Sequence, residues 1–90
     1  MTLHRYWIKF DPSSENRYVN RVKLGCGVTA FDFDDAIQIL EEIIFLDDKT
    51  PAILSVVEDV DVSSLECNHV RINMDNPAAG GIWFPLGYDY

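Results

Sequence analysis

Residues 32–45 constrain the fold more than any other stretch, because they carry one continuous helical pattern. Apolar residues recur at helical spacing there, namely Phe33, Ala36, Ile37, Leu40, Ile43 and Ile44. Asp32 can cap the N-terminus, with Asp35 three positions on, and acidic side chains in the first turn suit the helix dipole. The acidic pair at 47–48 is unfavourable at a C-terminus, so we expect the helix to end near Phe45. A helix with one apolar stripe must bury that stripe against another element.

The residues before this helix predict strands. Residues 3–10 alternate, with His4, Tyr6, Ile8 and Phe10 on one face, as is typical of a strand with one apolar face. A turn-rich loop at 11–16 leads to a second strand predicted over 18–24, and we expect the two strands to pair as an antiparallel hairpin. Gly25-Cys26-Gly27 interrupts that strand before 28–31 resumes it. Two glycines so close favour a β-bulge or a bend, and would also allow a ligand to approach the backbone.

Shorter elements are predicted after the helix. Residues 53–57 are rich in β-formers, residues 63–66 have capping-box spacing that predicts a short helical turn, and residues 69–74 are expected to be extended. A last short strand is predicted at 82–84. The order ββαβ, with the extra terminal strand, predicts a single α+β domain over residues 1–90. We expect the helix on one face of a mixed sheet, and a β-grasp-like arrangement fits this order.

Length and composition point to one small domain without a membrane span. A chain of 90 residues, 48% of them hydrophobic, can bury one modest core. The longest apolar run, Ile43–Leu46, is too short to cross a bilayer. The first residues lack the apolar region of a signal peptide, which predicts a cytoplasmic protein. Cys26 and Cys67 are too few for a disulfide framework, so we expect reduced thiols, with one disulfide as the alternative.

The negative charge is unevenly distributed along the chain. Residues 1–31 hold five basic and two acidic side chains, which gives +3, whereas residues 32–90 hold two basic and thirteen acidic ones, which gives −11. Ten of these acids fall between Asp32 and Asp61. Such asymmetry predicts an acidic face that can steer a basic partner, and the alternative is a charged surface that serves solubility alone.

The calcium pattern in the acidic run is incomplete. Asp59, Asp61 and Ser63 occupy the first, third and fifth places of a calcium-binding loop. Ser64, however, stands where glycine is needed and Val70 where a bidentate glutamate is needed, so a solvated strand end explains the acids better.

Other site chemistries lack the residue spacing they need. Cys26, Cys67, His69 and His4 do not show the paired spacing of structural zinc ligands, and nothing indicates an activated thiol. The sequence holds no phosphate loop, dinucleotide fingerprint or nucleophile elbow. We therefore predict no catalytic residue, no cofactor and no metal ligand.

The strands predicted before the helix suggest one aromatic and basic surface. Trp7 shares one face of the predicted strand with Arg5 and Lys9. Together with Arg21 and Lys23 they form an aromatic and basic set that suits single-stranded nucleic acid. A solvated face on which the basic side chains cover the indole is the alternative, and the net charge of −8 disfavours phosphate binding.

Three segments together resemble a group of short bacterial proteins without a known activity. They are Gly25 to Phe31 leading into Asp34-Asp35-Ala36, then Val57 to Ser63, then Gly81 to Tyr88. The resemblance implies a bacterial domain that stands by itself. It implies no functional residues.

The charge distribution and the missing motifs favour a binding or inhibitor module, such as an immunity or antitoxin-like protein that neutralises a basic partner. The contacts that we predict are Asp34, Glu41, Glu42, Asp47, Asp48, Glu58, Asp59 and Asp61, with Trp83 as an interface anchor. Two alternatives stay open. One is a small enzyme or metal site that uses Cys26, Cys67 and His69. The other is a structural subunit or homodimer formed through an exposed strand edge.

Overall fold

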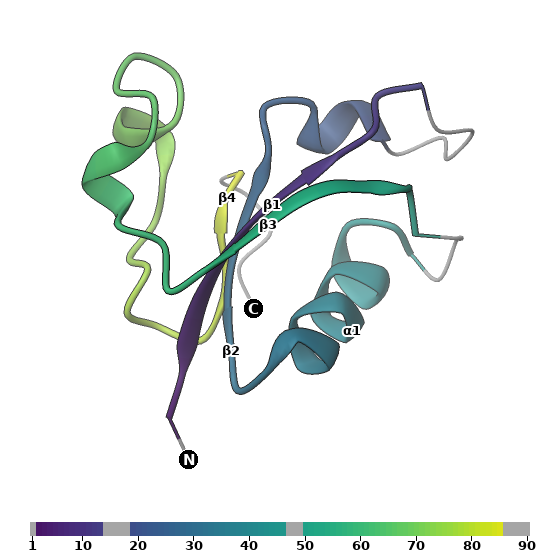
Figure 1. Cartoon of the computed structure of the whole chain (residues 1–90), viewed down its shortest axis with the longest axis horizontal. Coiled ribbons are helices and arrows are strands. Elements are labelled where there is room, and N and C mark those ends of the chain that lie inside the picture. The colour runs from purple at the N-terminus through teal and green to yellow at the C-terminus, as the bar shows by residue number, and fades with distance from the viewer. Residues whose placement is uncertain (1, 14–18, 47–49, 86–90) are drawn as a thin grey trace.

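Four strands form one sheet, and an α-helix lies against one of its faces (Figure 1). The strands are β1 (His4–Phe10), β2 (Cys26–Ala30), β3 (Ile53–Glu58) and β4 (Gly81–Phe84), in the order β3-β1-β2-β4. This computed structural model describes residues 2–13, 19–46 and 50–85. The predicted α+β class is confirmed. No helix within these ranges has the length and apolar character needed to cross a membrane.

The three strand pairings are all antiparallel. The prediction of a mixed sheet is therefore wrong. The β-grasp-like arrangement was expected with a mixed sheet and loses its support. Because β2 and β3 both run antiparallel to β1, which lies between them, they are parallel to each other. A parallel pair needs a crossover connection, and α1 (Phe33–Ile43) provides it. The fold is thus a split β-α-β unit with β4 added at the far edge.

The helix begins where the sequence predicts. The Asp32 carboxylate accepts a hydrogen bond from the backbone N–H of Asp35 (2.7 Å), and the Asp35 carboxylate accepts one from the N–H of Phe31 (3.1 Å). The first bond satisfies a donor that the first helical turn leaves free, and the second holds the residue before the N-cap against that turn. The helix ends close to the predicted position, with Ile44 as its C-cap. The Arg21 guanidinium donates to the Ile44 carbonyl (3.2 Å), which places positive charge at the negative end of the dipole.

The second strand lies later in the chain than predicted. A 3₁₀ turn, η1 (Val19–Val22), occupies most of the predicted strand at 18–24, and β2 begins only after Gly25. The strand prediction is therefore wrong over 19–24, and Tyr18 lies outside the described residues. The predicted bulge is confirmed, since the pairing of β2 with β4 shifts register between Gly27 and Val28.

The face of the sheet toward α1 carries the larger core. Tyr6, Ile8 and Phe10 of β1 point into it, as their alternation predicted. They meet buried residues from β2, α1, the turn directly after α1 and β4, namely Cys26, Val28, Ala30, Ala36, Leu40, Ile44, Phe45 and Ile82. The rings of Phe10 and Phe45 pack edge to face, 5.3 Å apart. Burying one side chain of this size contributes about 1.5–3 kcal/mol.

The opposite face of the sheet is covered by the segment between β3 and β4, which Figure 1 shows on the other side from α1. Trp7, only 5% exposed, stacks on Trp83 with ring centres 5.9 Å apart and also contacts Phe84. Val60 and Val70 from the covering segment complete this second cluster. The interpretation of Trp7 as part of an outward aromatic and basic surface is therefore wrong.

Two 3₁₀ turns lie within this covering segment. η2 (Val62–Ser64) confirms the predicted helical turn, but Asp61 rather than Ser63 caps it, accepting bonds from the Ser63 N–H (3.0 Å) and hydroxyl (2.7 Å). η3 (Arg71–Asn73) interrupts residues 69–74, so the extended segment predicted there is wrong. The strands predicted at 53–57 and 82–84 are confirmed as β3 and β4.

Gly25 and Gly27 lie directly against the two indole rings. A Cβ atom at Gly27 would come within 2.5 Å of the Trp83 ring, and one at Gly25 would overlap the Trp7 ring. Gly25 also has φ +119°, a conformation that other residues rarely adopt. These glycines therefore allow the tryptophans to approach the backbone, and at Gly27 an indole occupies the space that a ligand would need.

Candidate functional site

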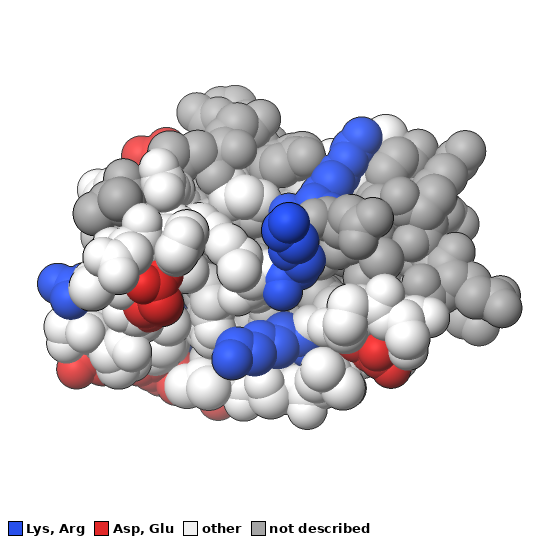
Figure 2. Space-filling view, turned by 90° about the horizontal axis from the view of Figure 1, so that it is seen from above, with Lys and Arg blue, Asp and Glu red and all other residues white. Residues whose placement is uncertain are grey.

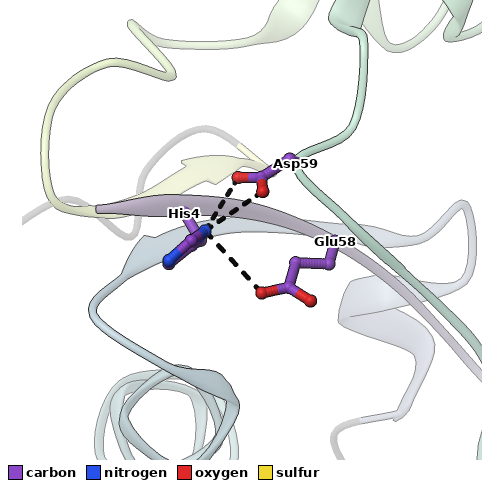
Figure 3. Close-up of side chains that lie close together, drawn as sticks. All are labelled: His4, Glu58 and Asp59. Atoms are coloured by element: carbon purple, nitrogen blue, oxygen red, sulfur yellow. Dashed lines mark hydrogen bonds and ion pairs between the residues drawn. The ribbon is translucent and has the colours of Figure 1, made fainter. Parts of the chain in front are cut away.

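His4, Glu58 and Asp59 lie together at one end of the sheet (Figure 3). His4 opens β1 and Glu58 closes β3, and the antiparallel pairing of these strands brings the two ends side by side. His4 Nδ1 lies 3.0 and 3.1 Å from the two Asp59 carboxylate oxygens and 3.7 Å from Glu58 Oε1. Both carboxylates are exposed, and His4 is half-buried.

The backbone at Asp59 explains why two consecutive acids reach the same histidine. Neighbouring residues of a strand point to opposite faces. Asp59, however, has φ +53°, in the left-handed region, directly after the strand ends. The chain turns there, and Figure 3 shows both carboxylates directed toward His4.

The three side chains offer one imidazole nitrogen and two carboxylate oxygens within 4.8 Å of one another. Divalent metals accept such donors, although a histidine between two carboxylates also forms an ordinary ion pair. Among the described residues, Asp59 groups with His4 and Glu58 rather than with Asp61, whose carboxylate caps η2. The calcium-loop pattern therefore does not describe how these acids are arranged.

A pocket of about 480 Å³ opens next to Glu58, between β3 and the start of α1. Tyr6, Asp32, Phe33, Val56 and Glu58 line it. The helix packs over β2 and β4 rather than over the β3 edge, so this part of the sheet face stays open. The pocket combines two carboxylates, one from each side, with two aromatic rings and one apolar side chain.

The aromatic side chains in the pocket hold each other in place. The Tyr6 and Phe33 rings pack edge to face with centres 6.1 Å apart, and the Tyr6 hydroxyl donates to Glu58 Oε1 at 3.5 Å. Burial raises the pKa of Tyr6, and the negative charges of Glu58, Asp32 and Asp59 raise it further. The acids add to the shift because they would repel a tyrosinate, so Glu58 and Asp32 make the surroundings of the Tyr6 hydroxyl more negative.

Arg5 lies beside the cluster of Figure 3 and donates to the Val60 carbonyl (3.1 Å), whereas three other basic side chains lie away from it. Lys9 is exposed near the end of β1, and Arg21 and Lys23 are exposed in and after η1. Figure 2 shows Lys and Arg side chains gathered on the face seen from above, while the cluster of Figure 3 lies where β1 begins. The charge asymmetry of the sequence thus corresponds in part to two ends of the sheet.

The predicted contact residues are spread over several places. Glu58 and Asp59 lie together in the cluster, whereas Asp34 is exposed in the first turn of α1 and Asp61 caps η2. Glu41 and Glu42 lie further along α1, where they accept hydrogen bonds from Thr50 (2.9 Å) and Gln38 (3.2 Å). Asp47 and Asp48 lie outside the described residues.

Trp83 requires a correction. It is 1% exposed and packs on Trp7 and Gly27, so it cannot anchor an interface without leaving the core. Its indole nitrogen is buried and has no hydrogen-bond partner among the described residues. Sequence reasoning missed Tyr6 and Asp32 as site residues, and it considered His4 only as a zinc ligand beside Cys26, Cys67 and His69, not as a partner of Glu58 and Asp59. Pairing residues 4–10 with 53–58 would have placed His4 and Tyr6 beside Glu58.

The thiols are not placed for catalysis together. Both cysteines are free, Cys26 in the core and Cys67 on the surface. Burial raises the pKa of Cys26 far above its ordinary value, which disfavours the reactive thiolate. Among the described residues, the group that could hold a metal ion contains neither thiol, and it does not contain His69.

No family model matches this chain, and no curated protein or solved structure is significantly similar to it. The resemblance to short bacterial proteins therefore stays a prediction, and any function must be argued from the site itself.

Proposed function

We propose that this domain is a protein-binding module for a partner with a basic surface, and that the pocket between α1 and β3 receives an Arg or Lys side chain. One observation carries the proposal. Asp32 and Glu58 contribute carboxylates to a single pocket whose other walls are aromatic and apolar.

The lining of the pocket suits a long basic side chain. Its cationic end can pair with Asp32 and Glu58, and its aliphatic stem can pack on Val56. A guanidinium is the better fit because it is planar and stacks on aromatic faces such as those of Tyr6 and Phe33. Asp59 and the overall charge of −8 add attraction at longer range.

An inhibitor of the immunity or antitoxin type, acting in the bacterial cytoplasm, is the role that we propose for this module. Its small size and its acidity support that role, since complementary charge speeds association with a basic protein and suppresses wrong partners. Glu58 and Asp59 are the predicted contacts that lie at or beside the pocket. Asp34 is a candidate for the rim because it follows the pocket residue Phe33 in the first turn of α1.

The proposal can be tested without knowing the partner. Argininamide is titrated into ¹⁵N-labelled protein, and citrullinamide, which has the same α-amino group but an uncharged side chain of nearly the same shape, serves as the control. We expect saturable shifts of the Tyr6, Phe33 and Val56 amides with argininamide, and shifts at least about tenfold weaker with citrullinamide, because the charge pairs are lost.

Matched variants locate the binding. Asp32→Asn keeps a side chain that can cap α1, and Glu58→Gln keeps an acceptor for the Tyr6 hydroxyl, so each removes charge with little change in structure. Both should weaken argininamide binding, whereas Glu42→Gln on the outer part of α1 should not. Equal effects of all three variants, or equal binding of the two probes, would contradict a specific cationic pocket.

A further inference from the structure

The two edge strands of the sheet differ in burial. At one edge, β4 is buried along its whole length, with Trp83 1% exposed, and it is followed by Pro85, which has no N–H to offer. At the other edge, every residue of β3 is exposed. Among the described residues, β1 is the strand that pairs with β3, so the outer side of β3 has no strand beside it.

The exposed edge is also apolar. Ile53 is 39% exposed, Leu54 64%, Val56 40% and Val57 46%. Prolines, inward-pointing lysines and β-bulges normally protect a free strand edge from pairing with another chain. β3 contains no proline and no lysine, and its one irregularity lies near its start. One register shift in the pairing with β1 leaves Leu54 without a partner, and the remaining strand is continuous.

We propose that β3 pairs antiparallel with β3 of a second copy of this chain, about a two-fold axis, and joins two four-stranded sheets into one. The sequence of β3 is suited to itself in this direction. With the axis through Ser55, Leu54 of each copy lies opposite Val56 of the other, so apolar residues meet there, and the two Ser55 residues lie opposite each other.

The position of the one charged residue in β3 favours antiparallel over parallel pairing of the two copies. Glu58 is its last residue, so antiparallel pairing separates the two Glu58 positions by about 20 Å along the strands, or six residues at about 3.4 Å each. That distance exceeds the Debye length of about 8 Å at physiological salt. Parallel pairing would put the two carboxylates on neighbouring strands about 4.8 Å apart. The closed two-fold contact uses the same surface on both copies and leaves no further β3 edge to recruit a third.

This dimer extends the proposed function without depending on it. A two-fold axis perpendicular to the joined sheet leaves both helices on the same face. Each pocket is partly lined by β3 through Val56 and Glu58, so the two pockets would flank the axis on that face. A partner with two suitably spaced basic residues would then bind both pockets and gain avidity.

Sedimentation velocity over a range of protein concentrations tests the pairing. We expect the mass to rise from 10.3 kDa toward twice that value. Val57→Lys should weaken dimerisation at least about 100-fold, because it places a charged side chain in the apolar interface, where it would lose water without gaining a partner. Leu24→Lys is the matched control, since Leu24 is 48% exposed outside β3 and the substitution changes charge equally. It should leave dimerisation unchanged.

A second variant and a second measurement guard against a folding defect in Val57→Lys. Leu54→Lys changes the most exposed apolar residue of β3 and should have the same effect on dimerisation while the thermal midpoint changes little. In the wild type, hydrogen exchange of the amides at 54–57 should slow as concentration rises. The proposal is overturned if the wild type stays monomeric at about millimolar concentration, if it forms open-ended oligomers, or if both β3 variants dimerise normally. Argininamide binding to the Val57→Lys monomer tests the pocket separately.

Discussion

Among single residues, Gly27 shows most directly how packing limits the sequence. Its missing side chain leaves room for the Trp83 ring, which is buried and cannot swing away as an exposed flexible side chain would. We predict that Gly27→Ala lowers the free energy of unfolding by about 1–3 kcal/mol, the usual cost of overpacking a core. Urea denaturation followed by tryptophan fluorescence measures this effect, and the fluorescence also reports on the stacked indoles.

Gly80 is the matched control for this substitution. A Cβ atom there would meet nothing within 4 Å, and the residue is exposed. We therefore expect Gly80→Ala to change the free energy of unfolding by no more than about 0.5 kcal/mol. A similar loss in both variants would mean that general backbone effects, rather than the indole ring, set the cost at Gly27.

Among the helices and strands, α1 depends most clearly on a single capping side chain. The Asp32 carboxylate satisfies the N–H of Asp35 at 2.7 Å. We predict that Asp32→Ala lowers the free energy of unfolding by about 0.5–2 kcal/mol, the usual cost of losing an N-cap. Chemical denaturation followed by circular dichroism measures the loss. Asp32→Asn should retain most of the stability because asparagine is also a good cap, and an equal loss in both variants would argue against capping.

The elements that the sequence predicts well are those whose signal is local. The start of α1 follows from Asp32 and the apolar spacing after it, and β1 follows from its alternation. The second strand was misplaced because tertiary contacts decide its position. Val22 is buried within η1, and Arg21 from the same turn binds the end of α1. Neither contact leaves a periodic trace in the sequence.

The candidate site was predicted only in part for the same reason. Glu58 and Asp59 could be chosen from the acidic run, since charge is visible in the sequence. Their partner His4 lies 54 positions before Glu58, and only the pairing of β1 with β3 joins them. Trp83 was misjudged because an aromatic residue between glycines is compatible with both an interface and a core. Its stacking on Trp7 decides for the core.

Across the whole domain, the direction of several pKa shifts defines a pH range of greatest stability. Hydrogen bonds from Ser13 lower the pKa of Asp11 below its ordinary 3.8, bonds from Ser63 do the same for Asp61, and the Asn68 N–H lowers that of Glu66 below 4.5. The folded state therefore favours the charged carboxylates. Their contribution is present above the ordinary values and is lost as the pH falls through the lower folded values.

On the alkaline side the sign is reversed. Burial raises the pKa of Tyr6 above 10.0 and that of Cys26 above 9.0, so the folded state favours the protonated forms. Their contribution is present below the ordinary values and is lost as the pH rises toward and through the folded values. We predict a free energy of unfolding that is nearly constant between about pH 5 and pH 8 and decreases on both sides.

Two variants separate the acid and alkaline limbs of this profile. Asp61→Asn keeps an acceptor for the Ser63 N–H but does not titrate, so it should reduce the loss of stability between pH 5 and about pH 2. Tyr6→Phe keeps the ring that packs on Phe33 but removes the titrating hydroxyl, so it should reduce the loss above about pH 9. Urea denaturation across the pH range measures both effects. Each group is expected to change stability on one side of the pH range only. A variant that changes the free energy of unfolding equally at every pH would therefore show that its residue stabilises the fold through packing or capping, and not through its titration.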